Sequence, residues 1–132
     1  MVSEEYWPMP SDTDKCALLE RGFEYITAWK LRGETIKPVS LDWTEASGWI
    51  YAFITEGRVR YFGISTTVLR SRLDGYSYQI NDRVSALIRG LVSADQYVAI
   101  YGLRRPGRTK EELEREESEL ITEFETDWNV RR

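Results

Sequence analysis

The chain has 132 residues and a formal net charge of −4, a length that fits one domain with one core. No apolar run approaches the roughly 20 residues that a membrane-spanning helix needs. The absence of histidine excludes Ser-His-Asp and Cys-His catalysis, and the lone Cys16 excludes a disulfide framework or a cysteine metal site.

Charge is unevenly distributed along the chain. Residues 1–47 carry five Lys and Arg against nine Asp and Glu, residues 48–110 carry ten against four, and residues 111–132 carry three against nine. The middle of the chain is therefore basic and its ends are acidic. A basic stretch in an acidic protein predicts a localised anion-binding face, although solvated surface arginines are an equally simple interpretation.

The first predicted element is an amphipathic helix over residues 11–32, closed by Gly33. Apolar residues recur there at three- and four-residue steps, namely Cys16, Leu19, Phe23 and Ile26. Cys16 lies on this stripe, so we expect a core position and not a reactive thiol. The connection that follows contains a short extended piece near residues 39–43.

Residues 48–63 predict a β-hairpin. Two runs rich in β-branched and aromatic residues flank Glu56-Gly57, a typical turn pair. Each run carries a tyrosine, Tyr51 and Tyr61, and the second ends on Gly63. Aromatic core packing is the simplest interpretation of this stretch taken alone.

Four further elements are predicted. Ser65 or Thr66 can cap a short helix over residues 68–73, and a second helix spans residues 82–92. Residues 97–103 read as a strand, and Thr109 with Glu112 forms a capping box for a last helix that ends near Glu125. The order predicts an α/β (α+β) fold, a small central sheet with an antiparallel hairpin flanked by helices. We expect a helical extension (1–47) packed on a core (48–132) within one compact domain.

Glu117 occupies an unusual place on the last helix. The apolar stripe of this helix comprises Leu113, Leu120, Ile121 and Phe124, and Glu117 falls near its centre. A carboxylate directed at a core needs a counter-charge or a cation. Glu117 is therefore either a ligand for a hard cation such as Mg²⁺ or half of a buried pair, for which Arg72 is a candidate. Arg72 could instead face a phosphate.

These residues resemble the motifs of the GIY-YIG endonucleases. Residues 48–51 and 61–63 resemble the two halves of the name motif, residues 69–73 resemble the segment of the family's arginine, and residues 117–121 resemble its Glu-x-x-Leu-Ile run. Tyr76 and the Trp128-Asn129 pair also match. The resemblance covers residues 48–129, and the whole chain also looks like the small phage endonuclease II type and the related restriction enzymes. Trp49 stands where the family has glycine, and the spacing from Gly63 leaves Arg70 as a rival to Arg72.

The resemblance implies a metal-dependent DNA endonuclease. Glu117 would bind Mg²⁺ or Mn²⁺, Tyr51 would orient or deprotonate the attacking water, and Arg72 would neutralise charge on the phosphate. Tyr61 and Tyr76 would hydrogen-bond the phosphate or the water, and Asn129 would position the site. Contacts to the DNA backbone would come from Arg58, Arg60, Arg70, Arg83, Arg104, Arg105, Arg108 and Lys110.

The sequence leaves two other functions open. One is a nuclease-like module that binds DNA or a protein without cutting, and the other is a structural domain with a buried Arg–Glu pair. Because a domain of this size has one active site, cutting both strands would favour a homo-oligomer, for which the N-terminal helix is a candidate interface. The first residues lack the features of a signal peptide, so we expect a cytoplasmic protein.

Overall fold

The computed structural model describes residues 10–32, 35–38, 47–69, 73, 83–94 and 98–129. Its elements are α1 (Pro10–Glu20), β1 (Glu24–Arg32), β2 (Thr35–Pro38), β3 (Ser47–Thr55), β4 (Arg58–Val68), α3 (Arg83–Ser93), β5 (Val98–Arg104) and α4 (Lys110–Phe124). The strands form one five-stranded sheet in the order β2-β1-β5-β3-β4. Every neighbouring pair is antiparallel. The predicted fold class, a small sheet with an antiparallel hairpin and flanking helices, is confirmed.

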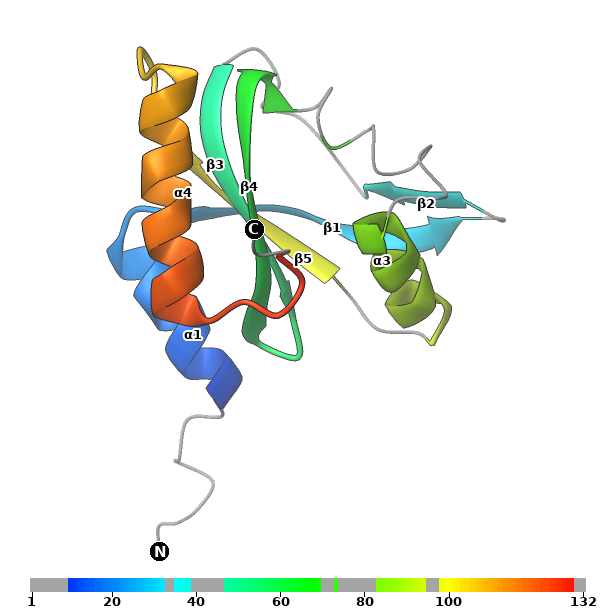
Figure 1. Ribbon diagram of the computed structural model, residues 1–132. Helices are drawn as coiled ribbons and strands as arrows, with labels where there is room; N and C mark the ends of the chain where they lie inside the picture. The colour runs from blue at the N-terminus through cyan, green and yellow to red at the C-terminus, as the bar shows by residue number, and fades with distance from the viewer. Residues whose placement is uncertain are drawn as a thin grey trace, which may run out of the picture.

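Helices cover both faces of this sheet (Figure 1). Successive residues of a strand point to opposite faces, and β3 distributes its side chains accordingly. Ile50, Ala52 and Ile54 pack in a cluster with residues of α1 and α4. Tyr51 and Phe53 pack in a second cluster with residues of α3. No helix within the described ranges is long and apolar enough to cross a membrane.

The predicted hairpin is formed by β3 and β4. Its turn residues Glu56 and Gly57 have φ values of 55° and 73°, the two left-handed positions that a type I′ turn requires. The strands first pair symmetrically about the turn, with Thr55 opposite Arg58. A register shift then follows between Phe53 and Ile54. This bulge places an extra residue, Arg60, in β4, and it decides which side chains face each other further along the hairpin.

The last helix begins and ends as predicted. Thr109 accepts a hydrogen bond from the backbone N–H of Glu112, and the Glu112 carboxylate accepts one from the backbone N–H of Thr109. This reciprocal capping box satisfies two donors at the start of α4. At the other end, Glu125 adopts the left-handed conformation of a helix cap. The local chemistry of both ends therefore sets the length of the helix that carries Glu117.

The predicted helix over residues 11–32 is wrong beyond its first half. α1 ends at Glu20, Gly22 takes a φ of 97°, and residues 24–32 form strand β1. The glycine stops the helix, and the run Glu24–Arg32 carries the aromatic and β-branched residues that favour strands. Cys16 is exposed and not in the core. The helix turns Leu18 inward instead, and this residue is fully buried.

Two other expectations need correction. Strand β1 pairs with β5 and β2, so residues 24–32 and 35–38 belong to the sheet itself and not to a helical extension packed on a separate core. Ser65 and Thr66 lie within β4 and do not cap a helix. Most of the expected helix over residues 68–73, and the extended piece near residues 39–43, lie outside the described residues.

Candidate active site

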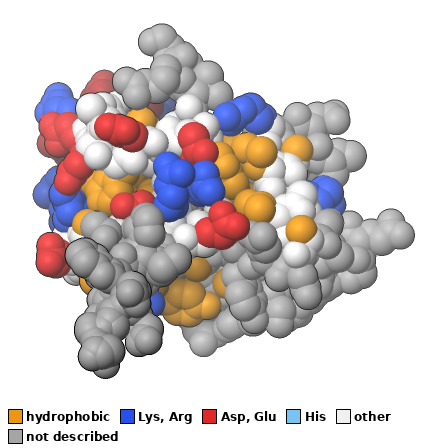
Figure 2. Space-filling model, turned by 90° about the horizontal axis from the view of Figure 1, so that it is seen from below, with side chains coloured by type: hydrophobic (Ala, Val, Ile, Leu, Met, Phe, Trp, Pro, Cys, Tyr) orange, Lys and Arg blue, Asp and Glu red, His pale blue; other side chains and the backbone are white. Residues whose placement is uncertain are grey.

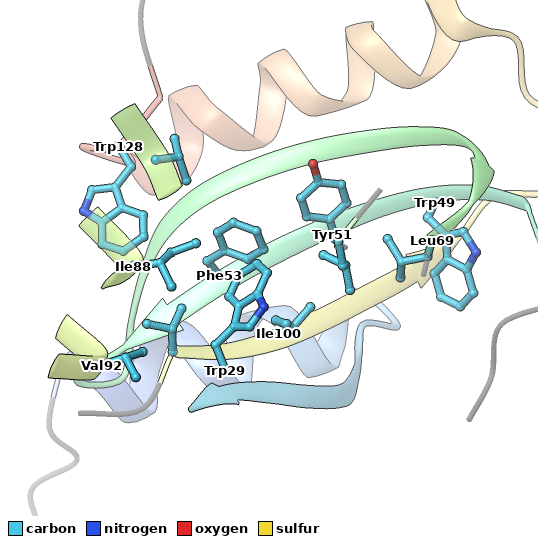
Figure 3. Close-up of a cluster of buried hydrophobic side chains, with 12 residues drawn as sticks. Trp29, Trp49, Tyr51, Phe53, Leu69, Ile88, Val92, Ile100 and Trp128 are labelled. Atoms are coloured by element: carbon cyan, nitrogen blue, oxygen red, sulfur yellow. The ribbon is translucent and has the colours of Figure 1, made fainter. Parts of the chain in front are cut away.

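Tyr51 lies in the aromatic cluster on the α3 face of the sheet and is fully buried (Figure 3). Its ring centroid is 5.4 Å from that of Phe53 and 6.4 Å from that of Tyr61. Tyr61 in turn stacks on Phe53 with centroids 5.2 Å apart. The structure therefore brings the two motif tyrosines onto one face of the hairpin, with Phe53 in contact with both.

Gly63 leaves the space that the phenol of Tyr51 occupies. These two residues stand opposite each other across β3 and β4. A Cβ atom added to Gly63 would lie 2.4 Å from both Cζ and the hydroxyl oxygen of Tyr51. No side chain at this position is compatible with the observed ring. The phenol therefore lies over the backbone of β4, and the hydroxyl end of Tyr51 reaches the outer strand of the sheet.

Trp49, in the place where the family's motif has glycine, does not disturb the strand. Gly48 absorbs the irregularity with a φ of 83° at a register shift, and Trp49 then pairs with Ser65 and Arg104. The indole lies against Gly102, whose added Cβ would be 3.0 Å from the ring. A glycine on the neighbouring strand therefore accommodates the large residue.

The segment 126–129 runs along the edge of β4. The side-chain amide of Asn129 accepts a hydrogen bond from the backbone N–H of Phe62 at 3.0 Å and donates one to its carbonyl at 2.9 Å. Thr126 donates to the same Asn129 oxygen at 2.6 Å, and the backbone N–H of Trp128 donates to the carbonyl of Arg60 at 2.9 Å. Asn129 thus fixes the backbone between Tyr61 and Gly63.

Two of the arginines expected to contact DNA also bind this segment. Arg60 forms an ion pair with Asp127 at 2.8 Å and a longer one with Glu56 at 3.4 Å. Arg83 donates to the carbonyl of Trp128 at 2.5 Å and to that of Asp127 at 3.3 Å. Both guanidinium groups therefore join the last described residues to the body of the protein.

Glu117 lies on α4 between two residues of the helix's buried side. Leu113 and Leu120 are buried against the sheet, whereas Glu117 is half-buried. The periodicity places Glu117 near the centre of the apolar stripe, and the structure leaves its side chain less buried than the leucines on either side. The helix packs on β3 and β4 from the face opposite to the tyrosines. Tyr51 and Glu117 therefore approach β4, the outer strand, from its two sides.

The donor set around Glu117 fits one kind of metal site. No group of three acidic or cysteine side chains among the described residues could enclose an ion. Mg²⁺ commonly binds one or two carboxylates and takes its other ligands from water and substrate phosphates. A single half-buried carboxylate fits that pattern and does not fit a closed structural site.

The remaining predicted basic residues differ in their surroundings. Arg105 forms a bidentate ion pair with Glu116, whereas Arg58, Arg104, Arg108 and Lys110 are exposed. Figure 2 shows basic, acidic and hydrophobic side chains intermixed over the side of the molecule that it views. Arg70, Arg72 and Tyr76 lie outside the described residues. The described basic residues of the middle of the chain therefore include arginines paired within the protein and exposed ones, and the exposed Arg108 also contacts Glu116 at 3.6 Å.

Comparison with solved structures identifies the fold. Over 89% of this chain and 98% of the other, it matches a mutant of bacteriophage T4 EndoII with a TM-score of 0.72 and 23% identity. It also matches the restriction endonuclease HPY188I in complex with product DNA, with a TM-score of 0.55 and 15% identity over 83% of this chain and 78% of the other. The fold is that of endonuclease II. The resemblance inferred from the motifs is thereby confirmed at the level of the fold.

Other comparisons return nothing. Neither a scan against protein-family models nor a search of curated proteins finds a match. At these identities the two solved structures establish the arrangement of helices and strands, and the chemistry must be argued from this chain's own residues.

Sequence reasoning missed two contacts that organise the candidate site. The contact between Gly63 and Tyr51 depends on the bulge at Arg60, because symmetric pairing about the turn would place Tyr51 opposite Phe62. The Arg105–Glu116 pair joins two elements whose separation in space the sequence does not reveal. One signal was available for the first contact, since a small residue in an aromatic strand often marks close approach of another group.

Proposed function

We propose that the protein is a divalent-metal-dependent endonuclease that hydrolyses DNA phosphodiester bonds by a GIY-YIG mechanism. The observation that carries this proposal is the phenol of Tyr51 laid over Gly63, in a hairpin that matches the family's motif and in a fold shared with EndoII. Gly63 leaves the hydroxyl end of Tyr51 over bare backbone, and the match of this hairpin to the family's motif favours a catalytic role for that hydroxyl. The structural neighbour bound to product DNA supports DNA as the substrate.

In this mechanism Tyr51 orients the attacking water and takes up its proton. Because the ordinary pKa of tyrosine is near 10, this role needs nearby positive charge, which Arg72 would supply while it neutralises charge developing on the phosphate. Tyr61, in ring contact with Tyr51, and Tyr76 would hydrogen-bond the phosphate or the water. Asn129 would act indirectly, by fixing the strand between Tyr61 and Gly63.

Glu117 would hold one Mg²⁺ or Mn²⁺ ion. When bound, such an ion stabilises negative charge on the phosphate and on the leaving oxygen. The half-buried position of Glu117 on α4 keeps its carboxylate at a defined place beside the sheet. This proposal makes the carboxylate essential to cleavage and dispensable for DNA binding.

The exposed basic residues are the best candidates for contacts with the DNA backbone. Arg104, Arg108 and Lys110 follow one another from the end of β5 into the start of α4, and Arg58 lies at the hairpin turn. Their exposure leaves the charged groups accessible to phosphates. Arg60 and Arg83 would contribute through the fold, since their hydrogen bonds are made to the protein.

The number of copies needed depends on the product. One active site per chain cuts one strand at a time, so a double-strand break requires a homo-oligomer or two binding events. We propose a dimer or higher oligomer for an enzyme that makes double-strand breaks. Gel analysis of the product and the mass of the protein in solution together test this part.

The deciding experiment is incubation of the pure protein with supercoiled plasmid in Mg²⁺ or in chelator. We expect nicked or linear DNA only with the metal. The Glu117→Ala variant should lose cleavage and keep DNA binding. The matched control is Glu119→Ala, which removes an exposed carboxylate from the same helix and should cut normally. An inactive wild-type protein that still binds DNA would instead support the non-cutting binding module.

A further inference from the structure

Arg105 joins three parts of the molecule. Its side chain donates to Glu116 through Nε, at 3.1 and 3.2 Å from the two carboxylate oxygens, and through Nη2 at 2.8 Å. Its backbone N–H donates to the carbonyl of Gly48 at 2.7 Å. Arg105 itself follows directly after β5. One residue therefore connects β5, the start of β3 and the helix α4.

Both ends of this connection lie beside residues of the proposed site. Glu116 precedes Glu117 in α4, and Gly48 lies three residues before Tyr51 in β3. A helix that slides or rotates against the sheet carries all its side chains with it. The link from Glu116 to Arg105 to Gly48 therefore limits the movement of the Glu117 carboxylate relative to the strand of Tyr51.

The link is built for fixed geometry. A bidentate arginine–carboxylate pair defines both distance and orientation, and the two side chains are only 31% and 24% exposed. The hydrogen bonds to Glu116 raise the pKa of Arg105 above its ordinary value, against the opposing effect of burial. Arg108 adds a longer contact to the same carboxylate at 3.6 Å.

The contact with Gly48 is equally specific. A Cβ atom on Gly48 would lie 2.7 Å from the carbonyl oxygen of Arg105, and the φ of Gly48 is 83°. Any other residue would be strained at this angle and would push the two backbones apart. The close approach holds the turn after β5 against the start of β3.

We propose that Arg105 is a positioning residue, which holds α4 against β3 so that Glu117 and Tyr51 act on the same phosphate. The proposal rests on the endonuclease function above and assigns Arg105 a role other than the DNA contact expected from its charge. The Nε–Nη2 edge of its guanidinium group, which could otherwise form a bidentate contact with a phosphate, is hydrogen-bonded to Glu116.

The test compares Arg105→Gln, Glu116→Gln and the double variant. We expect each single variant to lower the single-turnover cleavage rate at saturating protein by about 10- to 100-fold, because small displacements of reacting groups have effects of this size. The double variant should be no slower than the slower single variant, since both substitutions break one link. The dissociation constant for DNA in chelator should change by less than about 3-fold, because the proposal assigns neither side chain to phosphate.

Two arginines provide matched controls. Arg115→Gln removes a charge from the exposed position next to Glu116 and should leave the cleavage rate at the wild-type value. Arg104→Gln removes an exposed charge next to Arg105 and should weaken DNA binding. The slope of the logarithm of the binding constant against the logarithm of the salt concentration should fall by the amount that corresponds to about one phosphate contact.

The outcomes separate this inference from the function on which it rests. If Arg105→Gln weakens binding like Arg104→Gln and retains the wild-type rate at saturation, Arg105 is a phosphate contact and the proposal is wrong. A wild-type rate in Glu116→Gln also overturns it. If the wild-type protein does not cut DNA, the proposed function fails, and amide hydrogen exchange then tests the link by itself. Faster exchange of residues 47–53 and 110–125 in both single variants supports the link, and unchanged exchange overturns it.

Discussion

The two faces of β3 differ in composition and in what they contact. Ile50, Ala52 and Ile54 point toward α1 and α4 and meet mainly apolar side chains. Tyr51 and Phe53 point toward α3 and build an aromatic layer that includes a motif tyrosine with its hydroxyl. The alternation of a single strand therefore separates residues that stabilise the fold from residues that can take part in chemistry.

The comparison also shows where the two kinds of residue must meet. Glu117 lies on α4, which packs on the side of β3 that presents Ile50, Ala52 and Ile54, the aliphatic face of this strand. Tyr51 belongs to the opposite, aromatic face. Between them lies β4, the outer strand of the sheet, which has no side chain at Gly63. A site that uses both groups would therefore form at this edge, and changes on the two faces should have distinguishable effects.

The largest combined effect is expected for Gly63→Ala. The new methyl group would overlap the phenol of Tyr51 at 2.4 Å, so the ring must leave its place. We expect a stability loss of about 1–3 kcal/mol from overpacking and a cleavage rate lowered by at least about 10²-fold from displacement of the tyrosine. Urea unfolding and single-turnover cleavage measure the two quantities.

The control for this substitution is Gly90→Ala. A Cβ on Gly90, within α3, would meet nothing within 4 Å, so we expect a gain of about 0.5–1 kcal/mol from helix propensity and an unaltered cleavage rate. In a Tyr51→Ala background, Gly63→Ala should lose most of its destabilising effect. An equal cost in both backgrounds would show that the strain at Gly63 has another source.

Tyr51→Phe separates the hydroxyl from the ring. The ring contacts with Phe53 and Tyr61 remain, so the free energy of unfolding should change by no more than about 1.5 kcal/mol, the net value of one hydrogen bond. The cleavage rate should fall by about 10²–10⁴-fold if the hydroxyl is the general base. An unchanged rate would limit Tyr51 to packing and assign activation of the water to another group.

On the aliphatic face, Leu18→Ala should have the opposite pattern. Leu18 is fully buried in the cluster of α1 and α4, and its truncation should cost about 2–5 kcal/mol. Measured well below the unfolding temperature, cleavage should proceed within about 3-fold of the wild-type rate, because Leu18 and Tyr51 pack in different clusters on opposite faces of β3. A roughly 3-fold change in rate is a small change in the activation free energy. A large loss of rate without unfolding would mean that the two faces are not separable.

The smallest effect is expected for Thr109→Ala. This change removes one half of the capping box of α4 and should lower stability by about 1 kcal/mol. Thr109 lies two turns of helix before Glu117, so the rate should fall by less than about 2-fold. Thermal unfolding with parallel cleavage assays checks both, and a strong loss of rate would make the start of α4 part of the site.

Features with a local cause could be predicted from the sequence. Glu56-Gly57 determines its own turn, and Thr109 with Glu112 satisfies the start of α4 without help from the rest of the chain. Helical periodicity alone places Glu117 on the side of the last helix that carries its apolar residues, near the centre of that stripe, and the structure shows the side chain half-buried there. These three features delimited the hairpin and the carboxylate helix, the main elements of the candidate site.

Features that depend on pairing between distant segments could not be predicted. Phe23 and Ile26 follow Leu19 at helical spacing, yet residues 24–32 form a strand that pairs with β5 and β2. Contacts with these distant strands override the local periodicity. The bulge at Arg60 changes the partner of Tyr51 from Phe62 to Gly63, since a one-residue shift exchanges every pairing. Asn129 was matched by motif, but only the fold shows that its amide binds the backbone of Phe62.

The central claim is that Tyr51 and Glu117 act together on one phosphate at the edge of β4. Its most direct test is a double-mutant cycle on the single-turnover cleavage rate with Tyr51→Phe and Glu117→Gln. Groups that act on one phosphate as a unit have strongly non-additive effects. We therefore predict that the double variant cuts about as slowly as the slower single variant. A rate reduced by the product of the two separate losses would contradict the account, because it would mean that Tyr51 and Glu117 act independently.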